Sequence, residues 1–195
     1  LLTVKKVIIY IGLLGFLTLQ LSGCTTVVGA GATLGVTAFQ ERGIKGRALD
    51  LKTEALILES FISQELLLPA TIGVEVYEGR VLLTGASKNN KMTDKAVKLS
   101  WAIDGVKDVI NEIQTNNSTS ITDFSKDSWI TAQLRSKLTF DKNVYSINYS
   151  IETVNGTVYL IGIAQNNAEH DIVKQHAAQI KFVKRVISHV RIKKK

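Results

Sequence analysis

The chain has 195 residues, which is enough for one domain or two small ones. It is 45% hydrophobic, so it can bury a core. Its formal charge of +7 fits an anionic membrane surface or polymer but is too diffuse to indicate nucleic acid. The single cysteine excludes an internal disulfide.

The first 23 residues have the order of charged and apolar residues that is typical of a secretory signal peptide. Lys5 and Lys6 form a short positive region, and an apolar run follows over 7–19. A membrane-spanning helix is the alternative, but a run of about 13 residues is shorter than the roughly 20 that cross a bilayer. We therefore expect residues 1–23 to be a signal peptide, and the remaining chain then has a charge of +5.

The expected signal peptide ends in Leu21-Ser22-Gly23-Cys24, which resembles a bacterial lipobox. In proteins with this motif the cysteine sulfur takes a diacylglyceryl group, and the new N-terminus is usually acylated as well. The resemblance implies that Cys24 is lipidated, for example with palmitate, and two or more acyl chains give stable anchoring. Thr25 is not the aspartate that typically retains lipoproteins at the inner membrane, so the resemblance favours the outer membrane, with the protein facing the periplasm.

Residues 24–46 are expected to form a flexible tether behind the lipidated cysteine. The segment is rich in Gly, Ala and Thr and has no sustained amphipathic pattern. The alternative is a helix or strand of small residues that lies on the folded body. The stretch GAGATLG at 29–35 has the wrong spacing for a dinucleotide-binding fingerprint, and a signal peptide rather than a strand precedes it. A nucleotide site is therefore only weakly indicated.

The rest of the chain is a tandem duplication. Residues 79–113 align with 156–190 at a constant offset of 77. Upstream, LESFI at 58–62 aligns with LRSKL at 134–138 at an offset of 76.

These alignments predict a first domain at 47–115, a polar linker at 116–124 and a second domain at 125–195. The linker prediction rests on the stretch TNNSTSITDF, which is polar and lies between the two copies.

The first copy begins with a predicted helix, whose apolar residues recur at helical spacing: Leu51, Ala55, Leu58 and Ile62. An alternating strand follows at Ile72, Val74 and Val76. The remaining predicted elements are a tight turn at Glu78-Gly79, a strand over 81–85, a helix over 90–103 and a strand over 106–114.

The second copy repeats this order, and its first helix carries the stripe Ile130, Leu134 and Leu138. The predicted first strand alternates at Tyr145, Ile147, Tyr149 and Ile151. The other elements are a turn at Asn155-Gly156, a strand over 158–162, a helix over 167–180 and a strand over 183–192. Gly105 fits a helix stop in the first copy. Phe182 stands at that position in the second copy, whose helix must end otherwise.

Both copies therefore read α-β-β-α-β, which makes the chain an α+β protein. A hairpin followed by a helical crossover gives a three-stranded mixed sheet. Both helices of each copy are expected to cover one face of its sheet, because a buried sheet face needs a covering layer.

The paired stretches VYEGRVLLTG with WAIDGVKDVINEI, and TVNGTVYLIG with IKFVKRVISHV, resemble the BON domain of bacterial envelope proteins. The recurrent marks are a G-V-x-x-V strand entry and the hairpin glycines Gly79, Gly85, Gly156 and Gly162. Two such domains behind a lipobox look like the tandem outer-membrane lipoproteins of this family. The resemblance implies phospholipid binding and support of outer-membrane integrity, with no catalysis and no cofactor.

The residues provide no catalytic or metal-binding constellation of their own. His170 and His176 are six apart, which puts them on opposite sides of a helix, and His189 is alone on a predicted strand. With Cys24 lipidated, no thiol remains for catalysis or for zinc. We expect no enzyme and no metal site.

Trp129 is the residue most suggestive of a contact site. At 100° per residue it points about 140° away from the centre of the apolar stripe at Leu134. Tryptophan is favoured at membrane interfaces, and Lys126, Arg135 and Lys137 on the same helix could meet lipid phosphates. Trp129 aligns with Thr53 at the offset of 76.

Two alternatives remain for the contact site and its partner. Packing of Trp129 between the two copies is the alternative to membrane contact. The family resemblance favours anionic phospholipid as the partner, and an envelope protein such as the barrel-assembly machinery is the other candidate. The basic tail, Arg191 and 193–195, either adds charge attraction or is simply solvated.

Overall fold

The computed structural model describes residues 40–64, 71–115 and 121–194. The expected signal peptide, Cys24 and most of the expected tether lie outside these ranges. The first repeat contains α3 (Gly43–Ser63), β1 (Ile72–Tyr77), β2 (Arg80–Gly85), α5 (Asn90–Trp101) and β3 (Asp108–Asn111). The second contains α6 (Ile121–Phe140), a short 3-10 helix η2 (Ser146–Asn148), β4 (Tyr149–Val154), β5 (Thr157–Ala164), α7 (Asn167–Ala178) and β6 (Arg185–Ile192).

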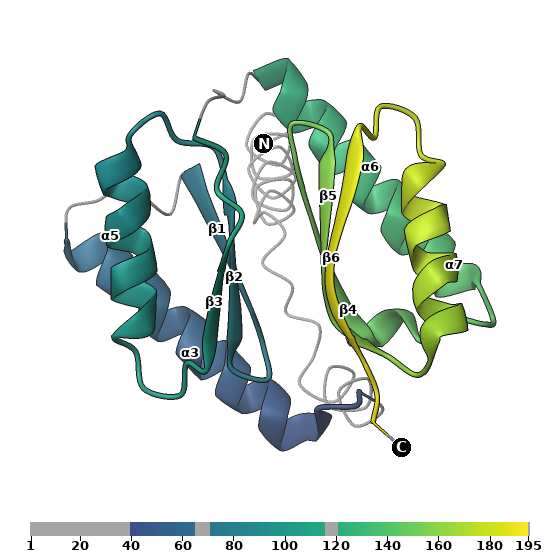
Figure 1. The fold of residues 1–195 in the computed structure, drawn as a ribbon, viewed down its shortest axis with the longest axis horizontal. Helices are drawn as coiled ribbons and strands as arrows, with labels where there is room; N and C mark the ends of the chain where they lie inside the picture. Colours follow the sequence, from purple (N-terminus) through teal and green to yellow (C-terminus); the bar gives the residue numbers. More distant parts are fainter. Residues whose placement is uncertain (1–39, 65–70, 116–120, 195) are drawn as a thin grey trace, which may run out of the picture. The chain divides into compact units, whose positions relative to one another are not determined.

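Each repeat has one three-stranded mixed sheet. In the first, β1 and β2 are antiparallel and β2 and β3 are parallel; β4, β5 and β6 repeat that arrangement. The parallel pair needs a crossover, which α5 or α7 supplies. In each repeat both helices lie on one side of the sheet (Figure 1). The predicted pair of αββαβ units in an α+β protein is confirmed.

The two hairpins turn through residues in the left-handed conformation. Glu78 and Gly79 have φ of 54° and 77°, and Asn155 and Gly156 have 52° and 78°. Two positive φ angles are what a two-residue type I′ turn requires, and its twist matches that of the strands. A Cβ on Gly156 would lie 2.8 Å from the backbone oxygen of Phe182, so only glycine fits there.

The other two hairpin glycines of the repeats, Gly85 and Gly162, do not lie in turns. They pair with Ile72 and Tyr149, the first residues of β1 and β4. A Cβ at Gly162 would lie 2.0 Å from the backbone oxygen of Asn148. Glycine here permits the close approach of the chain that enters the sheet.

The buried face of α3 is not the predicted one. Most of the predicted stripe is exposed, and Ile62 is 65% exposed. The buried residues are Asp50, Thr53, Ile57 and Phe61. They lie 77 residues before Asp127, Ile130, Leu134 and Leu138, all of which are buried. The offset of 76 in this helix is therefore wrong, and the offset of 77 holds throughout. The prediction of the buried face was wrong because α3 carries apolar residues on two faces, and periodicity does not say which face meets the sheet.

The start of β4 also differs from the prediction. Tyr145 and Ile147 precede the strand, and residues 146–148 form η2 instead. The backbone N–H of Tyr145 donates to a carboxylate oxygen of Glu169 at 2.8 Å, which fixes this turn to α7. The apolar alternation over 145–151 predicts a longer strand, because a local pattern contains no information about the distant Glu169 carboxylate.

Several predicted boundaries shift by a few residues. α3 begins at Gly43, inside the expected tether, and α6 begins at Ile121, inside the expected linker. α5 and α7 end at Trp101 and Ala178, two residues before the predicted ends. Helix ends are decided by capping, and Asn89 and Asn166 accept bonds from Met92 and Glu169 N–H at the other ends of α5 and α7.

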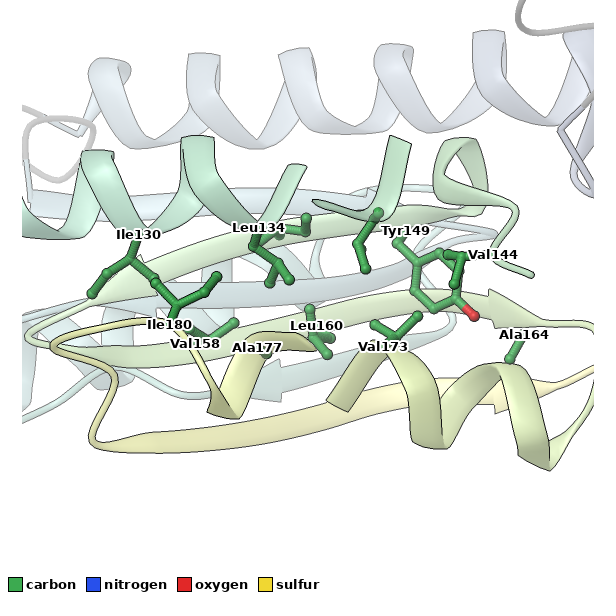
Figure 2. Close-up of a cluster of buried hydrophobic side chains, with 12 residues drawn as sticks. Ile130, Leu134, Val144, Tyr149, Val158, Leu160, Ala164, Val173, Ala177 and Ile180 are labelled. Carbon is green, nitrogen blue, oxygen red and sulfur yellow. The ribbon is translucent and has the colours of Figure 1, made fainter. Parts of the chain in front are cut away.

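Each repeat has its own apolar core between its helices and its sheet. In the second repeat, Ile130 and Leu134 of α6 meet Val158 and Leu160 of β5, with Val173 of α7 against the same strand (Figure 2). The first repeat has the equivalent cluster around Ile57 and Phe61. Within the described ranges, no helix combines the length and apolar character needed to cross a membrane.

The sheet faces that the helices leave open form a third cluster that joins the repeats. Tyr77 and Leu82 of the first repeat pack with Tyr159 and Ile161 of the second, and all four are buried. Gln114 extends this contact, since its amide nitrogen lies 3.1 Å from the carbonyl oxygen of Val154 and 3.2 Å from the Tyr159 hydroxyl. The two repeats thus share an apolar interface with polar edges.

Candidate functional site

The outward position of Trp129 is set by a buried aspartate two residues before it. Asp127 accepts hydrogen bonds from the backbone N–H groups of Asn155 and Gly156 at 2.6 and 2.8 Å. These bonds tie the first half of α6 to the β4–β5 turn and fix the rotation of the helix. Ile130 then faces the core and Trp129 faces solvent, with 43% of its surface exposed.

Phe182 is the neighbour of Trp129. The two ring centroids are 6.0 Å apart and the rings meet edge to face at 69°. Phe182 lies in the loop between α7 and β6 with φ of 72° and is 47% exposed. It belongs to the same repeat as Trp129, so the recorded ring contact is within the second repeat and not between the repeats. A bulky residue with a positive φ angle has a strained backbone conformation.

Two lysines lie beside these rings. The ammonium of Lys181 is 4.8 Å from the centre of the Phe182 ring, and that of Lys126 is 6.0 Å away. Lys126 also lies 3.9 Å from Asp123. We call Lys126, Trp129, Lys181 and Phe182 the aromatic–basic patch. The exposed cations Lys184 and Arg185 follow it in the chain, and no acid lies within 4 Å of either among the described residues.

The same corner of the first repeat has different chemistry. With the offset of 77, Lys52 takes the place of Trp129 and Gly105 that of Phe182. Asp104 and Asp108 replace Lys181 and Arg185 there. The corner of the first repeat forms part of a hollow of about 970 Å³ with mixed charge. Among the described residues, the pair of exposed rings therefore occurs at this corner of the second repeat and not at the equivalent corner of the first.

The other predicted contact residues lie elsewhere. Arg135 points toward β4, with its guanidinium 3.5 Å from the carbonyl oxygen of Ile151, and lines a hollow of about 350 Å³ with Glu152. Lys137 is two turns beyond Trp129, beside Phe140, which is 83% exposed. Of the predicted cations, the structure brings only Lys126 to the patch.

Sequence reasoning did not include Lys181 and Phe182 in the site. A signal for Phe182 was present, since a phenylalanine replaces the helix-stop glycine of the other repeat. It was interpreted as a different helix ending. In fact Phe182 adopts the left-handed conformation of Gly105, whose φ is 93°, and the helix ends in the same way.

The basic tail contacts the first repeat. Arg191 pairs with Glu78, and Lys193 lies 2.9 Å from a carboxylate oxygen of Glu41. Arg191 therefore links the two repeats and Lys193 pairs with the segment just before α3, so the expectation of a simply solvated tail is wrong for these two cations.

The three histidines occupy separate places. His170 forms a hydrogen bond with the Ser188 hydroxyl at 2.8 Å. His176 bonds to the Asp141 carboxylate at 2.7 Å, and His189 bonds to the Glu112 carboxylate at 2.8 Å. Burial lowers the pKa of His170, and the bond from His176 lowers the pKa of the Asp141 carboxyl. Within the described ranges no three ligand-type side chains come together as a metal site.

Comparison with known proteins identifies the family of both repeats. The model of the BON domain matches residues 50–117 and 126–194. The chain therefore belongs to the BON domain family. It is 33% identical to the outer membrane lipoprotein DolP of Haemophilus influenzae over 189 residues, which cover 94% of this chain and 93% of that protein. The expected resemblance to tandem BON proteins of the DolP type is confirmed.

Two further relatives are similar over parts of the chain. An uncharacterized protein in the gshII 5′ region of Anaplasma centrale is 41% identical over 125 residues, which cover 64% of this chain and 83% of that protein. The 21 kDa hemolysin of Actinobacillus pleuropneumoniae is 34% identical over 118 residues, or 60% of each chain.

Proposed function

We propose that the second repeat binds anionic phospholipid through the aromatic–basic patch. The observation that carries this proposal is the difference between the two corners: Trp129 and Phe182 are exposed at the second repeat, whereas Lys52 and Gly105 stand in their places at the first. Exposed aromatic rings suit the apolar side of a membrane interface, and the cations beside them suit phosphate. Each basic residue near an anionic surface contributes about 1 kcal/mol.

The strain at Phe182 supports a role in binding. A phenylalanine in the left-handed region costs about 1–2 kcal/mol relative to glycine, and about half of its surface remains exposed. Core packing does not account for such a residue. Contact of its ring with a membrane does.

We further propose that the chain is an outer-membrane lipoprotein, anchored at Cys24 and facing the periplasm, where it supports envelope integrity as a binding protein rather than an enzyme. The likeness to the DolP lipoprotein over nearly the whole chain supports this, together with the lipobox. The alternative is docking to an envelope protein, such as the barrel-assembly machinery, through the same patch.

Tryptophan fluorescence tests the lipid proposal. The unit Val36–Lys195 contains both cores and is compact by itself, so it suits the experiment. Trp101 is also exposed and needs replacement by Phe, so that only Trp129 reports. We expect a blue shift with vesicles that contain phosphatidylglycerol, none with phosphatidylcholine alone, and suppression by salt.

Phe182→Gly is the most informative variant, because it introduces the glycine that the first repeat has at this position and removes the backbone strain. It should weaken vesicle binding about tenfold, as expected for one lost interfacial ring. Lys52→Ala, at the equivalent corner of the first repeat, should leave binding unchanged. No shift with any vesicle, or equal loss in both variants, would contradict lipid binding by the patch, and saturable binding to a purified envelope protein would then favour the docking alternative.

A further inference from the structure

Helix α3 carries a row of apolar residues on its outer face, most of which are exposed. Its members are spaced alternately four and three residues apart, and we call them the α3 seam: Ile44, Ala48, Leu51, Ala55, Leu58 and Ile62. Ile44 and Leu51 are each 47% exposed and Ile62 is 65% exposed, while Leu58, at the edge of the row, is partly buried against the core of the first repeat. The opposite face of α3 supplies the core through Ile57 and Phe61. The seam is therefore a second apolar face.

The seam is specific to the first repeat. Of the six residues of α6 at the same positions, 77 further along, Ile121 and Ala132 are apolar and the other four are polar: Ser125, Ser128, Arg135 and Thr139. The two helices have the same task in the fold, since both cover their sheets with the opposite face. An apolar outer face on α3 alone indicates a contact that α6 does not make.

The spacing of the seam residues and the charges along α3 together indicate which partner packs against the seam. Alternation of four and three residues is the spacing by which one helix packs its side chains against a second helix. The first half of α3 is basic, with Lys45, Arg47 and Lys52, and the second half is acidic, with Glu54 and Glu59. A second α3 that runs antiparallel would place each basic half beside an acidic half, whereas a parallel one would oppose like charges.

We propose that α3 pairs antiparallel with α3 of a second copy of this chain. A twofold axis near residue 53 puts Ile44 against Ile62 of the second copy and Leu51 against its Ala55. Ala48 then meets Leu58, so that each inner layer combines a large with a small side chain. Such an interface uses the same surface on both copies and closes as a dimer. A single helix pair buries little surface, so the dimer is weak.

Sedimentation of the unit Val36–Lys195 over a range of concentrations tests the pairing, since this unit holds both cores. We expect a concentration-dependent shift from monomer to dimer. Leu51→Glu should weaken dimerisation by about 100-fold, because each dimer loses two buried leucines and gains two buried charges. Leu49→Glu is the matched control: Leu49 is 55% exposed on the same helix but points about 160° away, and this change should have no effect.

Cysteine cross-linking tests the direction of pairing, because Cys24 is the only cysteine of the chain and lies outside this unit. An antiparallel pair requires that the variant Ile44→Cys, mixed with the variant Ile62→Cys, form mixed disulfides in preference to disulfides between identical variants. Self-linking of each variant without mixed product would overturn the antiparallel arrangement. A monomer at all concentrations would overturn the dimer. If Leu51→Glu instead weakened vesicle binding by the monomer, the seam would be a lipid contact and the proposal would be wrong.

Discussion

Position 182 shows how one residue can change the surface chemistry of a repeat with little net effect on stability. Gly105 in the first repeat adopts φ of 93° without steric cost, and Phe182 adopts 72° at a cost. The ring recovers part of this through its contact with Trp129, for which about 0.5–1.5 kcal/mol is typical. The two contributions nearly cancel, so stability alone does not explain the phenylalanine.

We therefore predict that glycine at position 182 gives a more stable protein than alanine does. Phe182→Gly should change the free energy of unfolding by less than about 1 kcal/mol, because relief of strain offsets the lost ring contact. Phe182→Ala loses the ring but keeps the strain, so it should be less stable than Phe182→Gly by about 1 kcal/mol. Urea denaturation of the three proteins measures this. An alanine variant more stable than the glycine variant would show that residue 182 is not strained.

At the scale of elements, a buried aspartate in each repeat sets how its first helix lies on the hairpin. Asp127 accepts two backbone N–H groups of one turn, and Asp50 accepts those of Glu78 and Gly79 at 2.8 and 2.9 Å. Asp50 also pairs with Arg42 at 2.8 Å, and both side chains are almost fully buried. This repeated contact determines which face of each helix meets the core.

Removal of these carboxylates should destabilise the protein unequally. Asp127→Ala leaves two buried N–H groups without an acceptor and should cost about 3 kcal/mol. Asp50→Ala also leaves the Arg42 charge buried and unpaired, so its cost should be larger, about 3–5 kcal/mol. Thermal or urea unfolding of both variants measures the difference. Equal and small effects would mean that the helix position is set by apolar packing alone.

At the scale of the whole described structure, the interface between the repeats includes acidic groups as well as the Tyr77 and Tyr159 cluster. Burial, and then the negative charge of Glu75, raise the pKa of Glu152 to about 7, against the opposing effect of Arg135. Burial, and then Glu75, also raise the pKa of Glu54. Acidic groups of both repeats thus influence one another across the chain, and their protonation is coupled to the folded arrangement.

The contribution of Glu152 to stability should consequently fall as pH rises toward neutrality. The folded state holds the proton of Glu152 more tightly than the unfolded chain does, so the free energy of unfolding decreases between about pH 4.5 and about pH 7 and this contribution is constant above that. Its size is on the order of 3 kcal/mol. Urea unfolding across this range should show a shallower slope for Glu152→Gln than for the parent protein. Identical slopes would place Glu152 in a solvated environment.

The sequence by itself determined the duplication, the order of elements and the positions of both hairpin turns. These follow from local rules: alternation, helical spacing and the tolerance of Asn and Gly for positive φ. It also determined that Trp129 faces outward, because the stripe through Leu134 has one neighbouring sheet to meet. In α3 the same reasoning chose Leu51 and Ile62 for the core and was wrong, because that helix has two apolar faces.

Only the tertiary structure decided which face of α3 is buried, which residues join Trp129 and how the repeats meet. Asp50 and Asp127 bond to turns 28 residues away, and this contact is invisible to a periodic pattern. Lys181 and Phe182 reach Trp129 from a loop more than 50 residues further along. Such neighbours are fixed by long-range hydrogen bonds and packing, which depend on the folded chain as a whole rather than on any local stretch of sequence.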